Sequence, residues 1–108
     1  MTSPITLELH RKDDRTEIEI RVRHPMEPGD ALPQKSGLPR APWFLQTIVI
    51  QLNEKTMVEG QLSASLTRNP RFGFSFSGIK TGDKFTVYCT DNKGQELKSE
   101  VVAKFGRA

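Results

Sequence analysis

Three side chains in this sequence could support acid-base, nucleophilic or metal chemistry. His10 and His24 are the two imidazoles, and Cys89 is the one thiol. Imidazole and thiolate are common ligands of zinc and of redox metals. The three residues do not follow a known ligand spacing, so a metal or redox enzyme using them requires that the fold bring all three together.

The alternation of apolar and polar residues predicts where each of these side chains points. His10 lies on the polar face of the first alternating run, where it is solvated. His24 continues the apolar face of residues 18–22, which places it at the core or its rim, hydrogen-bonded to loop backbone. Cys89 lies on the same apolar face as residues 85 and 87, so we expect it to be a buried structural thiol. We therefore assign no catalytic residue, no metal and no cofactor.

Charge and glycine patterns exclude two further classes of site. The net charge is +3, and acidic residues are interleaved with basic ones, so no nucleic-acid partner is expected. The segment "TGDK" at 81–84 precedes a strand rather than a helix, which excludes a phosphate-binding P-loop. No apolar run reaches membrane-spanning length, and residues 1–14 lack the pattern of an export signal, which by itself predicts a cytoplasmic chain.

Short alternating runs separated by turn residues predict an all-β chain. The pattern is typical of an immunoglobulin-like β-sandwich of about seven antiparallel strands, with a small open barrel as the alternative. At 108 residues the chain fits one domain, spanning 1–108. The runs lie at residues 5–10, 17–23, 43–53, 57–62, 72–77, 84–90 and 95–105.

Two features of this pattern bear on the ends of the strands. In the third run, one face is expected to carry Phe44, Ile48, Ile50 and Leu52, and the opposite face Leu45. In the fifth run, the phenylalanines at 72–76 are expected in the core. Residues 25–42 hold five of the seven prolines and form a loop longer than a hairpin needs, so we expect an ordered surface there.

The order of these elements, taken with four quoted segments, resembles the SoxZ family of the bacterial sulfur-oxidation carrier complex. The resemblance covers about residues 16–95. The segments are "HPMEPG" at 24–29, "APWFLQTIVIQLN" from 41, "TRNPRFGFSFSG" at 67–78 and "TGDKFTVYCTDNKG" at 81–94. One departure is Cys89, which stands where the family often has tryptophan.

The resemblance implies a non-catalytic subunit that forms a heterodimer with a SoxY-type carrier subunit. In that family the partner bears the cysteine to which thiosulfate-derived sulfur is attached, on a glycine-rich C-terminal arm that other sulfur-oxidation enzymes contact transiently. The family reaches the periplasm together with a signal-bearing partner, and this implication replaces the cytoplasmic prediction. A stand-alone protein- or ligand-binding sandwich remains the alternative.

The long loop and the strand ends beside it are the expected docking surface for the partner. The alternative is that these motifs have only a structural role. In that case "HPM" closes the end of the core, and "NP" begins a strand. The predicted contact residues are His24, Pro25, Met26, Glu27, Phe44, Asn69 and Pro70.

Overall fold

The computed structural model describes residues 4–24, 26, 42–62 and 68–104, and its regular elements within these ranges are all β-strands. Each strand is seven or eight residues long, close to the common length in globular proteins. The strands are β1 (Ile5–Lys12), β2 (Arg15–Val22), β3 (Leu45–Leu52), β4 (Lys55–Gln61), β5 (Arg71–Ser77), β6 (Lys84–Asp91) and β7 (Glu96–Val102).

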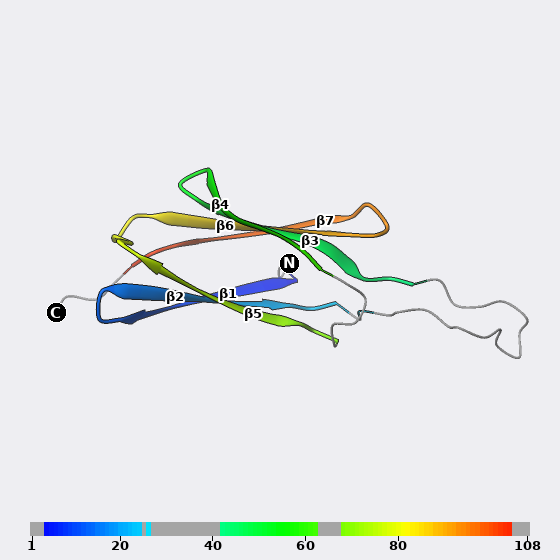
Figure 1. Cartoon of the computed structure of the whole chain (residues 1–108), viewed down its shortest axis with the longest axis horizontal. Coiled ribbons are helices and arrows are strands. Elements are labelled where there is room, and N and C mark those ends of the chain that lie inside the picture. Colours follow the sequence, from blue (N-terminus) through cyan, green and yellow to red (C-terminus); the bar gives the residue numbers. More distant parts are fainter. Residues whose placement is uncertain (1–3, 25, 27–41, 63–67, 105–108) are drawn as a thin grey trace, which may run out of the picture.

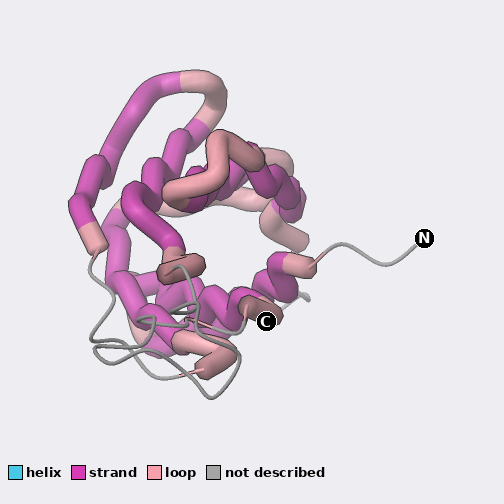
Figure 2. The backbone as a smooth tube through the Cα atoms, turned by 90° about the vertical axis from the view of Figure 1, so that its right-hand side faces the viewer, coloured by secondary structure: helices cyan, strands magenta, loops and turns pink. Residues whose placement is uncertain are grey.

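The seven strands form two antiparallel sheets that face one another (Figure 1). One sheet has the order β1-β2-β5 and the other the order β4-β3-β6-β7. Figure 2 views the same two layers from the right-hand side of Figure 1, so the sheets are seen nearly end-on. The prediction of an all-β sandwich with seven antiparallel strands is confirmed.

The core lies between the two sheets, and strands β2, β3 and β6 supply most of its buried side chains. Ile18 and Ile20 of β2 are fully buried, as are Phe85, Val87 and Cys89 of β6. These are alternate residues of each strand, because successive side chains of a strand point to opposite faces. Burying each large apolar side chain contributes about 1.5–3 kcal/mol to folding.

A β-bulge changes which residues of β3 face the core. The pairing of β3 with β6 shifts between Leu45 and Thr47, and Leu45 is fully buried beside the inward-facing Ile48. The prediction that Leu45 lies on the opposite face is wrong, because one extra residue in a strand reverses the facing of the residues before it. Phe44 is accordingly only half-buried.

The phenylalanines of β5 pack against the core without being enclosed by it. Phe72, Phe74 and Phe76 are half-buried, and the Phe76 ring lies 5.4 Å from the ring of Phe85. Strand β5 has β2 on one side only, so its side chains stay partly open along that edge. Their predicted place in the core is confirmed with this limitation.

The predicted proline-rich loop at 25–42 lies outside the described residues, except for Met26 and Pro42. The extent of the domain, 1–108, stays a prediction. The described part of the chain contains no helix that could cross a membrane.

Replacing Phe85 with alanine is expected to destabilise the protein by about 3–5 kcal/mol, since the ring is fully buried and a cavity would remain. Val102→Ala is the matched control, because Val102 is 44% exposed and its truncation should cost less than about 1 kcal/mol. Urea unfolding followed by tryptophan fluorescence measures both. Equal losses for the two variants would show that Phe85 does not occupy the core.

Candidate functional site

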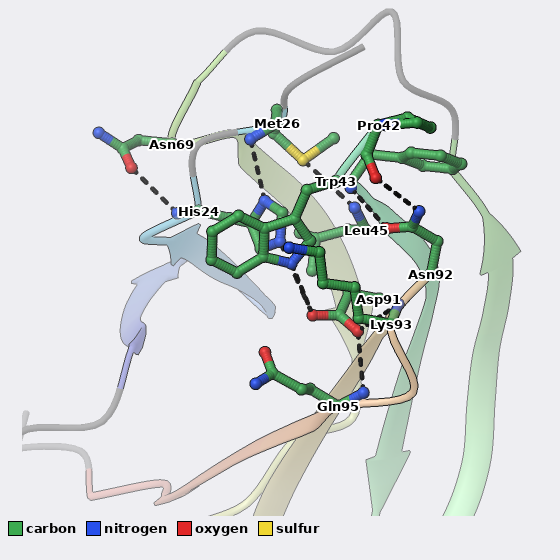
Figure 3. A network of polar contacts seen from close by, with 11 residues as sticks. His24, Met26, Pro42, Trp43, Leu45, Asn69, Asp91, Asn92, Lys93 and Gln95 are labelled. Carbon is green, nitrogen blue, oxygen red and sulfur yellow. Dashed lines mark hydrogen bonds and ion pairs between the residues drawn. The ribbon is translucent and has the colours of Figure 1, made fainter. Parts of the chain in front are cut away.

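One end of the sandwich gathers a network of polar contacts between segments that are far apart in the sequence (Figure 3). We call it the His24 end. It is built where β2 ends, where β3 and β5 begin, and where β6 turns into β7. Its residues are His24, Met26, Pro42, Trp43, Phe44, Leu45, Asn69, Pro70 and residues 91–95.

The carboxylate of Asp91 lies at the centre of this network and is 3% exposed. Its Oδ1 accepts hydrogen bonds from the backbone N–H groups of Lys93 at 2.9 Å and Gln95 at 2.8 Å. Its Oδ2 accepts the indole N–H of Trp43 at 3.0 Å. A buried charge is tolerated only when it is hydrogen-bonded in this way, so Asp91 fixes both the β6–β7 turn and the entry to β3.

The same contacts set the charge state of Asp91. Burial by itself raises the pKa of a carboxyl group, since it disfavours the ionised form. At Asp91 this effect is outweighed by the hydrogen bonds from Trp43, Gln95 and Lys93, with a contribution from the charge on His24 when protonated. The pKa of Asp91 therefore lies below its usual value of 3.8, and the group is ionised at neutral pH.

The imidazole of His24 is buried against Asp91 and Trp43. Its Nδ1 accepts the backbone N–H of Met26 at 2.9 Å, so in the neutral ring the proton is on Nε2. Nε2 lies 4.0 Å from Oδ2 of Asp91, and the ring meets the Trp43 ring edge-on at 4.9 Å. The Met26 N–H bond therefore requires an unprotonated Nδ1, and the ring holds the backbone of Met26 in place through it.

Met26 links the two sheets at this end, and Asn69 links two strands of the same sheet. The Leu45 N–H points to the sulfur of Met26 at 3.4 Å, and Met26 has a left-handed backbone with a φ of 50°. His24 and Asn69 exchange two bonds: the His24 N–H donates to Asn69 Oδ1 at 3.0 Å, and the Asn69 N–H donates to the His24 carbonyl at 2.8 Å. The start of β5 is thereby tied to the end of β2.

A second side chain of the β6–β7 turn, Asn92, holds the segment before β3. Its Oδ1 accepts the Phe44 N–H at 2.9 Å, and its Nδ2 donates to the Pro42 carbonyl at 2.9 Å. The Asn92 N–H also donates to the Phe44 carbonyl at 3.0 Å. Above this layer the ammonium group of Lys93 lies 4.1 Å from the centre of the Trp43 ring, a cation–π contact at the surface.

The structure brings together the described members of the predicted contact set, but most of them are buried. His24 and Met26 are each 4% exposed, and Pro70 is buried. Asn69 is exposed and Phe44 is half-buried, so these two can be touched from outside. Pro25 and Glu27 lie outside the described residues. The partner-contact set stays a prediction. His24 and Met26 lie beneath the surface, where they hold the neighbouring backbone in place.

Sequence analysis missed the residues that hold this end together: Trp43, Asp91 and Asn92. The hydrogen bonds from Trp43 to Asp91 and from the Phe44 N–H to Asn92 each span 48 residues of sequence, a distance at which no local pattern predicts pairing. A signal was present for Asp91, since it continues the apolar face of β6 and an acidic residue there requires hydrogen-bond donors. The segment "DNKG" predicted only a turn.

Comparison with known families identifies the chain. The family model described as "Sulphur oxidation protein SoxZ" matches residues 5–102. The chain belongs to the SoxZ family. No curated protein matched the sequence. Membership of the SoxZ family places the protein in sulfur oxidation and in association with other proteins of that process.

For a SoxZ protein, the state of its one cysteine is of direct interest. Cys89 is fully buried in the core, and burial raises the pKa of its thiol to about 12. Sulfur chemistry at cysteine requires the thiolate and access to it. Cys89 has neither at neutral pH, and its prediction as a buried thiol is confirmed.

The alternative of a metal or redox site requires His10, His24 and Cys89 to lie together, and the structure does not bring them together. His10 is exposed on β1, whereas His24 is buried at the end of β2 and Cys89 is buried within β6. Within the described residues, the one group of three metal-ligating atoms close together is Glu8, His10 and Glu19. Hydrogen bonds from Arg71 and Arg21 lower the pKa of Glu19 to about 2, so arginines already neutralise that carboxylate.

Replacing Asp91 with alanine is expected to destabilise the SoxZ fold by about 3 kcal/mol at neutral pH, because three buried donors lose their acceptor. Since the pKa of Asp91 is lowered by folding, this contribution is present above pH 3.8 and is lost as the pH falls further. Denaturant unfolding at several pH values measures the difference. Asp14→Ala, at an exposed turn, should be nearly neutral throughout. A constant difference down to low pH would contradict the assignment.

The thiol of Cys89 is expected to react with a small thiol reagent at pH 8 about a thousandfold more slowly in the folded protein than in the unfolded one, since its pKa rises by about three units. The stability linked to the protonated thiol is complete below pH 9.0 and is lost as the pH rises toward 12. Stopped-flow labelling with and without urea measures the ratio. Rapid labelling of the folded protein would show that Cys89 is accessible.

Proposed function

We propose that this chain is the non-catalytic partner subunit of a sulfur-carrier heterodimer. In this proposal a SoxY-type subunit carries thiosulfate-derived sulfur on the cysteine of its C-terminal arm. The observation that supports it most is Cys89: in a family that serves sulfur oxidation, the one thiol of this sequence is buried, with a pKa raised to about 12. The chain therefore contributes by binding rather than by carrying sulfur itself.

We propose the His24 end as the docking surface for the SoxY-type subunit. Hydrogen bonds and the Asp91 carboxylate fix its backbone before a partner arrives, so little ordering entropy is lost on binding. Its outer layer offers the half-buried rings of Trp43 and Phe44, the ammonium group of Lys93 and the amide of Asn69. An aromatic centre within a polar rim is the usual composition of a protein interface.

The compartment and the further partners follow the same resemblance. We propose that the heterodimer works in the periplasm, exported with the signal-bearing partner, and that other sulfur-oxidation enzymes contact it transiently. A stand-alone binding module is the competing function, and it predicts a stable monomer with no obligate partner.

The heterodimer is tested by producing the untagged chain with a tagged SoxY-type subunit and determining the intact mass of both after exposure to thiosulfate and the sulfur-oxidation enzymes. A one-to-one complex with sulfur adducts on the SoxY-type subunit alone is expected. A chain that stays monomeric would support the stand-alone module. An adduct on Cys89 would contradict the non-carrier role.

The docking surface is tested separately by charge reversal. Lys93→Glu should weaken the complex about three- to tenfold, because it removes the cation–π contact with Trp43 and reverses a charge at the rim. Lys55→Glu is the matched control, at the exposed start of β4 on the opposite end of the sandwich. Isothermal titration calorimetry measures both. Equal affinities for the two variants would place the partner elsewhere.

A further inference from the structure

A groove of about 280 Å³ opens at the surface beside the His24 end, where β2 ends and β5 begins. Its lining residues are Arg23, His24, Arg68 and Asn69. They come from two segments that the paired His24 and Asn69 hydrogen bonds hold together, so the groove has a fixed floor.

The two arginines of this groove, Arg23 and Arg68, differ from the nearest arginines of β2 and β5. Arg21 and Arg71, two residues from Arg23 and three from Arg68, each donate to the Glu19 carboxylate at 2.7 Å and are neutralised there. Arg23 and Arg68 are exposed, and neither forms an ion pair with a carboxylate of the described residues. Within the part of the chain that the structure describes, this small groove therefore has two guanidinium groups without a carboxylate partner.

Asn69 supplies a directed donor at the same place. Its Oδ1 is used by the His24 N–H, which fixes the amide orientation and leaves Nδ2 on the outer side. Figure 3 shows this nitrogen pointing away from His24. The left-handed backbone of Asn69, with a φ of 52°, is held by the bond of its N–H to the His24 carbonyl.

We propose that this groove binds a small sulfur oxyanion group, a sulfate or an S-linked sulfonate. Guanidinium groups donate paired hydrogen bonds to tetrahedral oxyanions, and such charge-assisted bonds are about twice as strong as neutral ones. Arg23 and Arg68 provide these bonds, and Asn69 Nδ2 adds a neutral donor that sets orientation. Sulfur is chosen over other oxyanions because the family serves sulfur oxidation.

Two sources can present this group to the groove. One is free thiosulfate or sulfate. The other is a sulfonate attached to the cysteine of a carrier subunit, and this second source rests on the proposed function. In that case the groove would hold the charged tip of the carried group next to the docking surface.

The test is an NMR titration of the isotope-labelled full chain at low ionic strength. The probes are sodium thiosulfate, S-sulfonated Gly-Gly-Cys-Gly-Gly and the same peptide with a free thiol, each compared with sodium chloride of equal ionic strength. The variant is R23Q/R68Q. The matched control is K12Q/R15Q, which removes the same charge from exposed residues at the β1–β2 turn, at the other end of β2.

Resonances of the Arg23, Arg68 and Asn69 side chains should shift with thiosulfate or with the sulfonated peptide. R23Q/R68Q should weaken that binding about tenfold or more, and K12Q/R15Q by less than about twofold. Tighter binding of the sulfonated peptide than of thiosulfate identifies the carrier-linked source, and equal binding identifies the free anion. Absent shifts, or equal losses in both variants, would overturn the proposal.

This outcome is independent of the heterodimer itself. R23Q/R68Q is also co-purified with the SoxY-type subunit. Loss of oxyanion binding with an intact complex separates the groove from docking. Failure of the wild-type chain to form any complex refutes the proposed function, whatever the titration shows.

Discussion

The burial of the Asp91 carboxylate is the constraint on which the rest of the His24 end depends. A charged group beneath the surface of a small sandwich is stable only if donors surround it, and here they come from the β6–β7 turn and from Trp43 before β3. The chain segments on either side must therefore adopt one arrangement. The hydrogen bonds to Asp91 therefore give the end of β6 and the starts of β7 and β3 one defined arrangement at the surface.

The same constraint links the two sheets. Trp43 contacts both Asp91 and the ring of His24, while the His24 ring orders Met26 and the sulfur of Met26 meets β3. His24 and Met26 support the surface from below, and Asn69, Phe44 and Lys93 form it. The arrangement suits a protein that works by contact. The burial of Cys89 agrees with this, since it removes the one thiol from the reach of sulfur compounds.

Much of the fold could be predicted from residue alternation. Period-two patterns predicted the inward residues of β2 and β6, including Cys89, and extending the pattern of β2 by two residues predicted the burial of His24. Leu45 was predicted wrongly because a bulge interrupts the alternation, and no residue type announces it. The Asp91 network could not be predicted, since its partners meet only after the two sheets have paired. Motif resemblance predicted the family but not which motif residues are exposed.

We propose that the partner binds at the His24 end, which is ordered around Asp91. Hydrogen–deuterium exchange of the chain alone and in complex with a SoxY-type subunit tests it most directly. Exchange should slow on binding at residues 42–45, 68–71 and 91–95, with little change at the opposite turns, 13–15 and 53–55. Protection confined to those opposite turns, or to the outer face of either sheet, would contradict it.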